Sequence, residues 1–205
     1  MNNTIYTIGH SDMEPANFIS MLQEKGITLV ADVRSVPRTE FAPRFNRDAL
    51  EPLLTENKLK YEPMAEPFGA RRNNPAMLDA DGKVNYDKVR KSAEFQKGMA
   101  RIRALMLEGE IPVLMCAEAN PMICHRFSMI SLAMQDAGLN VRHILRNRSV
   151  VENGLLEQEL LTKFADKLPQ PDMFRPIVST DDKIRLVYRL QNKAVAKSAL
   201  EGSRK

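Results

Sequence analysis

Five side chains that can transfer protons, bind metals or hold anions lie within eleven positions of one another. They are Cys116, Glu118, Cys124, His125 and Arg126. An apolar segment that reads as a strand (111–115) precedes them, and a helical segment (122–137) begins among them. A helix N-terminus has free N–H groups and a partial positive charge, which stabilise anions and favour the thiolate form of cysteine. We therefore expect an anion pocket beside a reactive or metal-binding group.

The two cysteines allow three interpretations. A buried cysteine such as Cys116 can simply pack as a small apolar side chain. It can also be a nucleophile, although cysteine phosphatases place an arginine six residues after the nucleophile, and here Met122 stands there. Finally, Cys116, Cys124 and His125 could supply three metal ligands, with His10 or Glu118 as a fourth. Neighbouring side chains on a helix point about 100° apart, so at this stage we assign no residue as a metal ligand and leave the cofactor open.

Two further loops carry polar motifs that end predicted strands. Gly9-His10-Ser11 follows a strand at 5–8, and Asp32-Val33-Arg34-Ser35 ends an almost continuously apolar strand at 28–33. His10 could be a general acid or base, or could hold its loop through a hydrogen bond. Several arginines occupy the loops that follow, and they could bind phosphate or form surface ion pairs with nearby acids. These are Arg34, Arg38, Arg44, Arg47, Arg71 and Arg72.

The alternation of strands and helices predicts an α/β fold. Strands are expected at 5–8, 28–33, near Tyr61, at 111–115 and at 141–145, and helices at 12–25, 47–57, 86–108, 122–137 and 152–167. A long loop joins them at 65–85. This order is typical of a three-layer sandwich with a mostly parallel central sheet and helices on both faces. The carboxyl ends of such strands form one edge, where ligands bind. We thus expect His10, Arg34, Glu118 and Arg126 to approach one cleft.

Composition narrows the class of protein. A chain of 205 residues is enough for one domain with a real core. We expect an α/β domain at 1–168 and a C-terminal extension at 169–205, made of a proline-containing linker and a basic amphipathic helix (181–197) that could support a homodimer. No apolar run is long enough to span a membrane, and the start of the chain lacks a secretory signal. Two cysteines do not make a disulfide framework, so we expect a cytoplasmic protein.

The ordered set of motifs resembles one family. Its parts are Thr7-Ile8-Gly9-His10-Ser11, Asp32-Val33-Arg34-Ser35-Val36-Pro37, Phe68-Gly69-Ala70-Arg71-Arg72, Cys116-Ala117-Glu118 and Cys124-His125-Arg126. Together, over residues 4 to about 150, they resemble the uncharacterised prokaryotic family known as domain of unknown function 488. The resemblance implies a compact α/β domain. It implies no particular activity, substrate or cofactor.

The residues favour an enzyme that acts on a phosphate-bearing substrate, such as a nucleotide or nucleic acid, at the strand ends. Glu118, His10 and Cys116 are the candidate catalytic residues: either of the first two would move protons, and Cys116 would be a nucleophile, a ligand or a pocket wall. The expected substrate-binding residues are Ser11, Asp32, Arg34, Ser35, Arg71, Cys124, His125 and Arg126. The alternatives are a non-catalytic module that binds or senses a small anion or nucleotide, and a Cys/His metal-binding protein.

Overall fold

A computed structural model describes residues 3–169 and 178–196, and its centre is one six-stranded sheet. The strand order is β3-β2-β4-β1-β5-β6. All neighbouring strands are parallel except the antiparallel pair β5 and β6. The bounds are β1 (Thr4–Gly9), β2 (Leu29–Asp32), β3 (Lys60–Pro63), β4 (Pro112–Cys116), β5 (Asn140–Ile144) and β6 (Val150–Glu152). This confirms the predicted α/β fold with a mostly parallel sheet.

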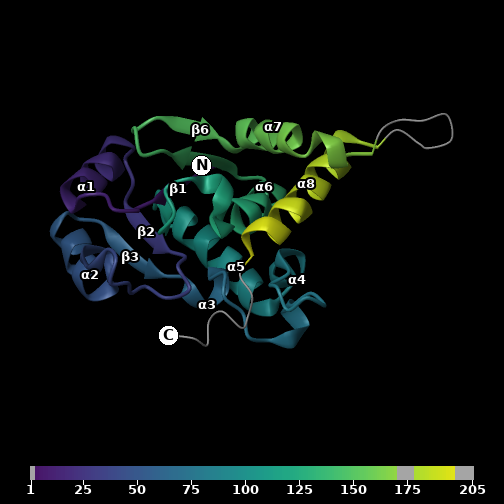
Figure 1. Cartoon of the computed structure of the whole chain (residues 1–205). Coiled ribbons are helices and arrows are strands. Elements are labelled where there is room, and N and C mark those ends of the chain that lie inside the picture. The colour runs from purple at the N-terminus through teal and green to yellow at the C-terminus, as the bar shows by residue number, and fades with distance from the viewer. Residues whose placement is uncertain (1–2, 170–177, 197–205) are drawn as a thin grey trace.

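Helices cover both faces of the sheet (Figure 1). Alternate strand residues point to opposite sides: Val30 and Val113 pack in one core with α1 (Pro15–Glu24), the 3₁₀ turn η1 (Pro43–Phe45) and α2 (Arg47–Glu56). Ala31 and Leu114 pack in the core on the other face. That face is covered by α3 (Ala65–Phe68), α4 (Tyr86–Arg90), α5 (Ala93–Leu107) and α6 (Leu132–Asp136). The result is the predicted three-layer arrangement.

Three predicted segments differ in detail. The single helix expected at 86–108 is wrong, because the Ser92 side chain accepts a hydrogen bond from the Phe95 N–H and starts α5 separately from α4. The helix expected at 122–137 is divided into η3 (Pro121–Ile123), a π-helix η4 (Arg126–Ser131) and α6. The long loop at 65–85 contains α3 and the short turn η2 (Pro75–Met77).

The C-terminal part of the described chain packs on the sheet domain. Helix α7 (Asn153–Lys163) is followed by the turn η5 (Ala165–Lys167), and α8 (Thr180–Val195) crosses beside them (Figure 1). Val187 and Tyr188 of α8 are buried in a cluster with Phe127 and Leu160. Residues 170–177 and 197–205 of the predicted extension lie outside the described residues, and the predicted homodimer stays a prediction. No helix within 3–169 or 178–196 has both the length and the apolar character needed to cross a bilayer.

Candidate functional site

The three polar loops meet because β2, β4 and β1 are neighbours in the sheet. Main-chain hydrogen bonds extend the strand pairing into these loops: His10 N–H donates to the Cys116 carbonyl (2.9 Å) and Ser11 N–H to the Ala117 carbonyl (2.8 Å). Gly9 allows this approach, since a Cβ atom there would lie 1.8 Å from the Glu118 carbonyl oxygen. Because there is no space for a side chain at position 9, glycine at this position allows Gly9-His10-Ser11 to pack against the Cys116–Glu118 loop.

A cavity of about 410 Å³ opens at this edge of the sheet. Asp32 and Arg126 are absent from its lining, but the other predicted site residues all line it: His10, Ser11, Arg34, Ser35, Arg71, Cys116, Glu118, Cys124 and His125. Ser11 has a φ of +46°, a backbone conformation that residues other than glycine seldom adopt. Such backbone strain is concentrated at functional sites. The cleft expected from the parallel topology is therefore present.

Asp32 holds Arg34 in place and does not face the cavity. The Asp32 carboxylate is 1% exposed and accepts hydrogen bonds from Arg34 Nε (2.8 Å), Arg34 Nη2 (2.5 Å) and the Tyr61 hydroxyl (2.9 Å). Burial, together with the Asp32 charge, raises the pKa of Tyr61, so that phenol stays a donor. Asp32 was expected to bind substrate; in the structure its carboxylate contacts Arg34 and Tyr61 and is absent from the cavity lining.

His10 is held in its neutral form by its surroundings. Its ring stacks on Phe45, with centroids 4.3 Å apart. Nδ1 lies 2.9 Å from the Ser11 carbonyl oxygen, which only accepts, and Nε2 lies 3.2 Å from Arg34 Nη1, which only donates. Burial, and then the Arg34 charge, lower the pKa of His10 to about 4. Both ring nitrogens are thus occupied at neutral pH, which fits the loop-holding role better than proton transfer.

Arg126 was expected to bind an anion, and its guanidinium instead ties down the loop behind the cavity. It is fully buried and donates to the carbonyl oxygens of Glu118 (Nη1, 2.5 Å) and Ala119 (Nη2, 3.0 Å). These are main-chain acceptors, so neither the expected open anion site nor a closed Glu118–Arg126 side-chain pair is formed. Arg126 is the first residue of a π-helix, where a regular helix was expected.

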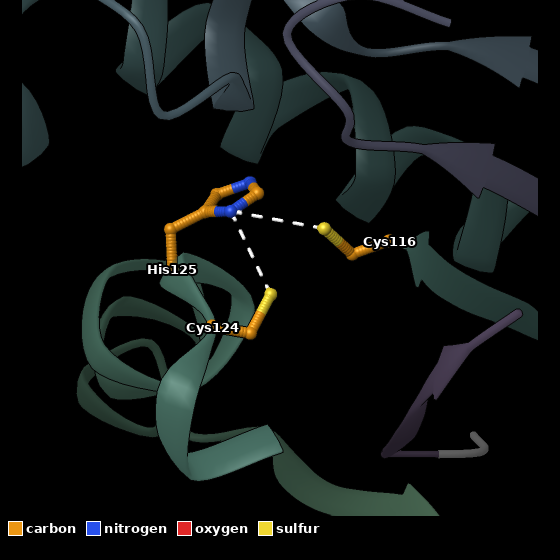
Figure 2. A group of neighbouring side chains, drawn as sticks. All are labelled: Cys116, Cys124 and His125. Carbon is orange, nitrogen blue, oxygen red and sulfur yellow. Dashed lines mark hydrogen bonds between the residues drawn. The ribbon is translucent and has the colours of Figure 1, made fainter. Parts of the chain in front are cut away.

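At the floor of the cavity, two thiols, an imidazole and a carboxylate converge. Glu118 Oε2 lies 2.9 Å from Cys116 Sγ and 3.3 Å from Cys124 Sγ. His125 Nδ1 lies 3.8 Å and 3.7 Å from the same two sulfurs (Figure 2). Both cysteines are free thiols, as expected for a chain without a disulfide framework.

The adjacent residues Cys124 and His125 can face one point because they do not share a regular helix. Cys124 is extended (φ −119°, ψ 145°), whereas His125 has helical angles (φ −61°, ψ −24°). The geometric objection to a metal, which assumed that both residues were helical, is therefore wrong.

The two thiols are electrostatically unequal. A hydrogen bond with Cys124, and then burial, raise the pKa of Cys116 well above its usual value. Burial acts in the same direction on Cys124, but the hydrogen bond from Cys116 and the charges of Arg126 and His125 outweigh it and lower the pKa of Cys124. Of the two sulfurs, Cys124 is thus the one favoured as a thiolate.

The mouth of the cavity contains apolar side chains that sequence reasoning missed. Phe41 is 79% exposed, Ile123 58% and Val36 50%, and all three line the cavity. Large apolar side chains exposed together are typical of binding surfaces. Phe41 could have been noticed as an aromatic residue in a polar, proline-bounded loop. Ile123 could not, because its segment was read as part of a helix.

The loop arginines divide into paired and free groups. Arg44 donates to the Asp12 and Met13 carbonyls, Arg47 pairs with Glu51, and Arg72 donates to the carbonyls of residues 66 and 67. In the described part of the chain, the guanidinium groups of Arg38 and Arg71 have no hydrogen-bond or ion-pair partner, and both residues line the cavity. Of these loop arginines, Arg38 and Arg71 are therefore the two with guanidinium groups free to meet an anion.

A second, larger cavity, of about 710 Å³, lies between α5, α6 and α8. Two of its four arginines are in ion pairs, Arg90 with Asp87 and Arg185 with Asp136 at 2.9 Å. The other two, Arg103 and Arg189, each donate to a main-chain carbonyl at 3.3 Å. This cavity also has no cysteine or histidine in its lining. The strand-end cavity, which has both free cations and reactive side chains, is therefore the better candidate site.

The fold and the cavity together define an α/β protein with a candidate site at the carboxyl ends of its strands. Residues 14–132, more than half of the chain, match the family model described as Domain of unknown function DUF488. The chain belongs to this family, which confirms the resemblance seen in the motifs. Comparison with curated proteins and with solved structures gives no match.

Proposed function

We propose that the protein is an enzyme that acts on a phosphate-bearing substrate, a nucleotide or a nucleic acid, in the strand-end cavity. The observation that carries this proposal is the pair of unpartnered guanidinium groups, Arg38 and Arg71, at the cavity mouth. Guanidinium groups match the geometry of phosphate oxygens. The phosphate of a nucleotide is favoured over other anions because an aromatic side chain at the same mouth can stack a base.

Phe41 supplies the second half of the recognition. Its ring is 79% exposed, and exposed aromatic rings beside a positive groove stack nucleobases without needing a particular sequence. The hydroxyl groups of Ser11 and Ser35 line the same cavity and can bind sugar or phosphate oxygens. Base, sugar and phosphate would each find a partner within one cavity of about 410 Å³.

The buried floor supplies the groups for chemistry. Glu118 is the candidate general base, because its carboxylate lines the cavity and can take a proton from a water or a substrate hydroxyl. Arg34 lines the cavity there, and Asp32 and His10 hold its guanidinium in position. Cys116 is 3% exposed, which suits a wall or a ligand better than a nucleophile that must reach its substrate.

The test is a panel of nucleoside mono-, di- and triphosphates and short single-stranded oligonucleotides, with binding and product formation both measured. Arg71→Ala and Arg38→Ala should each weaken binding about 10- to 100-fold, because each loses a hydrogen bond from a charged donor. Arg189→Ala is the matched control, since this exposed arginine lies on α8 outside the cavity.

Three outcomes decide the proposal. Binding with turnover, both reduced in the Arg71→Ala variant, supports an enzyme. Binding without turnover by any member of the panel would overturn catalysis and favour the sensing module. Binding that the two mouth variants leave unchanged would overturn the cavity as the site.

A further inference from the structure

We propose that Cys116, Cys124 and His125 bind a zinc ion and that Glu118 completes its coordination. The ligand atoms of the first three residues all lie within 4.8 Å of one another, and the three residues are buried. Figure 2 shows the two sulfurs and the imidazole turned toward a common point. This inference goes beyond the proposed reaction, and it does not depend on which substrate the cavity takes.

The spacing of these atoms fits tetrahedral zinc. Bonds of about 2.3 Å to sulfur and about 2.05 Å to nitrogen, at tetrahedral angles, place a sulfur and a nitrogen ligand roughly 3.6 Å apart. The distances from His125 Nδ1 to the two sulfurs are 3.8 Å and 3.7 Å. These are long for hydrogen bonds, whereas they match two ligands of one ion closely.

The second nitrogen of His125 fixes the tautomer that a metal needs. Nε2 lies 3.0 Å from the Val33 carbonyl oxygen. Because a carbonyl only accepts, Nε2 carries a proton, so the neutral form of His125 turns the lone pair of Nδ1 toward the sulfurs. Metal-binding histidines almost always donate their other N–H in this way. Val33 follows the second strand, so the sheet itself orients this ligand.

Glu118 would reach the fourth position by a turn of its side chain, since its carboxylate lies beside the three atoms that are within 4.8 Å of one another and is not one of them. Its Oε2 lies 2.9 Å and 3.3 Å from the two sulfurs, and Glu118 lines the cavity together with them. An exchange of this carboxylate for a water or a substrate oxygen would open a coordination position toward the ligand and would free Glu118 to accept a proton. Thiolate and imidazole donors select zinc over magnesium or calcium, which prefer oxygen.

The charges around the cluster also fit a bound ion. Two thiolates and one carboxylate give −3, so a Zn²⁺ ion leaves −1. Arg126 is fully buried, and its main-chain N–H lies 3.5 Å from Cys124 Sγ. Its guanidinium donates hydrogen bonds to two neutral carbonyl groups, and its positive charge would balance that of the site. On binding, both thiols release their protons to solvent as the two sulfur–zinc bonds form.

The test uses the full-length chain, purified under reducing conditions, stripped with a chelator, and titrated first with Co²⁺ and then with Zn²⁺. We expect one equivalent of Co²⁺ to give thiolate-to-cobalt charge-transfer bands and the intense visible bands of four-coordinate cobalt. One equivalent of Zn²⁺ should remove them. The parent protein alone can therefore decide the proposal, whether or not the variants fold.

Variants identify the ligands. Cys116→Ser and Cys124→Ser should each weaken Zn²⁺ binding more than about 100-fold, which exceeds the 10- to 100-fold effect of outer-shell partners. Glu118→Gln should keep the charge-transfer bands and change the intensity of the visible bands. His143→Gln is the control, because this buried histidine bonds to Thr7 and Asn153 and lies outside the cluster.

Cobalt spectra without charge-transfer bands, or parent protein that binds no Zn²⁺ under reducing conditions, would overturn the proposal. A Cys116–Cys124 disulfide that persists in reductant would also overturn it, and would indicate a redox pair. Phosphate-ligand binding is measured separately, through Arg38 and Arg71, so failure of the metal site and failure of the proposed function give different results.

Discussion

Replacing Asp32 with Asn should show how strongly the cavity depends on one buried ion pair. The Asp32 and Arg34 side chains are 1% and 5% exposed and share two direct hydrogen bonds. Asn keeps the shape of Asp but removes its charge. The guanidinium of Arg34 would then remain buried without a counter-ion, beside His10 and the cavity.

The size of the effect follows from this burial. Breaking a buried pair by removing one partner costs about 3–5 kcal/mol, because the other charge is left uncompensated. Arg34→Met alone should cost a similar amount, since it leaves the Asp32 carboxylate buried. The double variant removes both charges, and we expect it to lose about 2–3 kcal/mol less than the sum of the single variants.

Urea unfolding followed by circular dichroism measures these free energies. The matched control is Glu62→Gln, which breaks the two-bond pair with Arg101 (2.9 Å and 3.0 Å). The Arg101 side chain is 46% exposed and the Glu62 side chain 20%, so the loss of this pair should cost less than about 1 kcal/mol. A cost below about 1 kcal/mol for Asp32→Asn, or strict additivity in the double variant, would refute the assigned role of Asp32.

Three further predictions test other parts of the molecule. Gly9→Ala should displace the Glu118 peptide, whose carbonyl oxygen would lie 1.8 Å from the new Cβ atom, and so lower both the free energy of unfolding and the ligand affinity. Gly154→Ala in α7 is the control: nothing lies within 4 Å of a Cβ atom there, so this change should stabilise the protein by up to about 1 kcal/mol. Equal effects of the two substitutions would contradict the packing argument. Burial lowers the pKa of His143 to about 4, so the unfolded chain binds a proton at this residue more readily than the folded chain does. The free energy of unfolding is then highest above about pH 6.5 and falls by up to ~3 kcal/mol between there and pH 4. If the His143→Gln variant lost stability with falling pH as steeply as the parent, the prediction would be wrong. Tyr188→Phe should cost about 1 kcal/mol, because the hydroxyl bonds to Glu157 at 3.0 Å; no loss of thermal stability would show that α8 is not held through this contact.

The strands and the position of the site were predictable because their signals are local. An apolar run such as 28–33 can only be buried on both faces, and it places Asp32 and Arg34 at its carboxyl end. The parallel topology then brings His10 and Glu118 to the same edge. Nothing beyond the order of the elements was needed for that inference.

The finer features depend on tertiary contacts and could not be read from the pattern. β6 has three residues and pairs antiparallel with β5, which is too short for a period to be recognised. The π-helix at Arg126–Ser131 has a sequence that an α-helix could also have, and its first residue, Arg126, donates to main-chain carbonyls. The convergence of Cys124 and His125 required the extended backbone at Cys124.

Amide chemical-shift mapping on ¹⁵N-labelled protein tests the central claim most directly. The probes are inorganic phosphate and a 5′-phosphorylated single-stranded oligonucleotide, each added to the parent and to the Arg71→Ala variant. We predict saturable shifts at Ser11, Ser35 and Arg71 in the parent, and much weaker ones in the variant. Shifts confined to the larger cavity around Arg103 and Arg189, or no saturable shifts with either probe, would contradict the strand-end cavity as the site of a phosphate-bearing ligand.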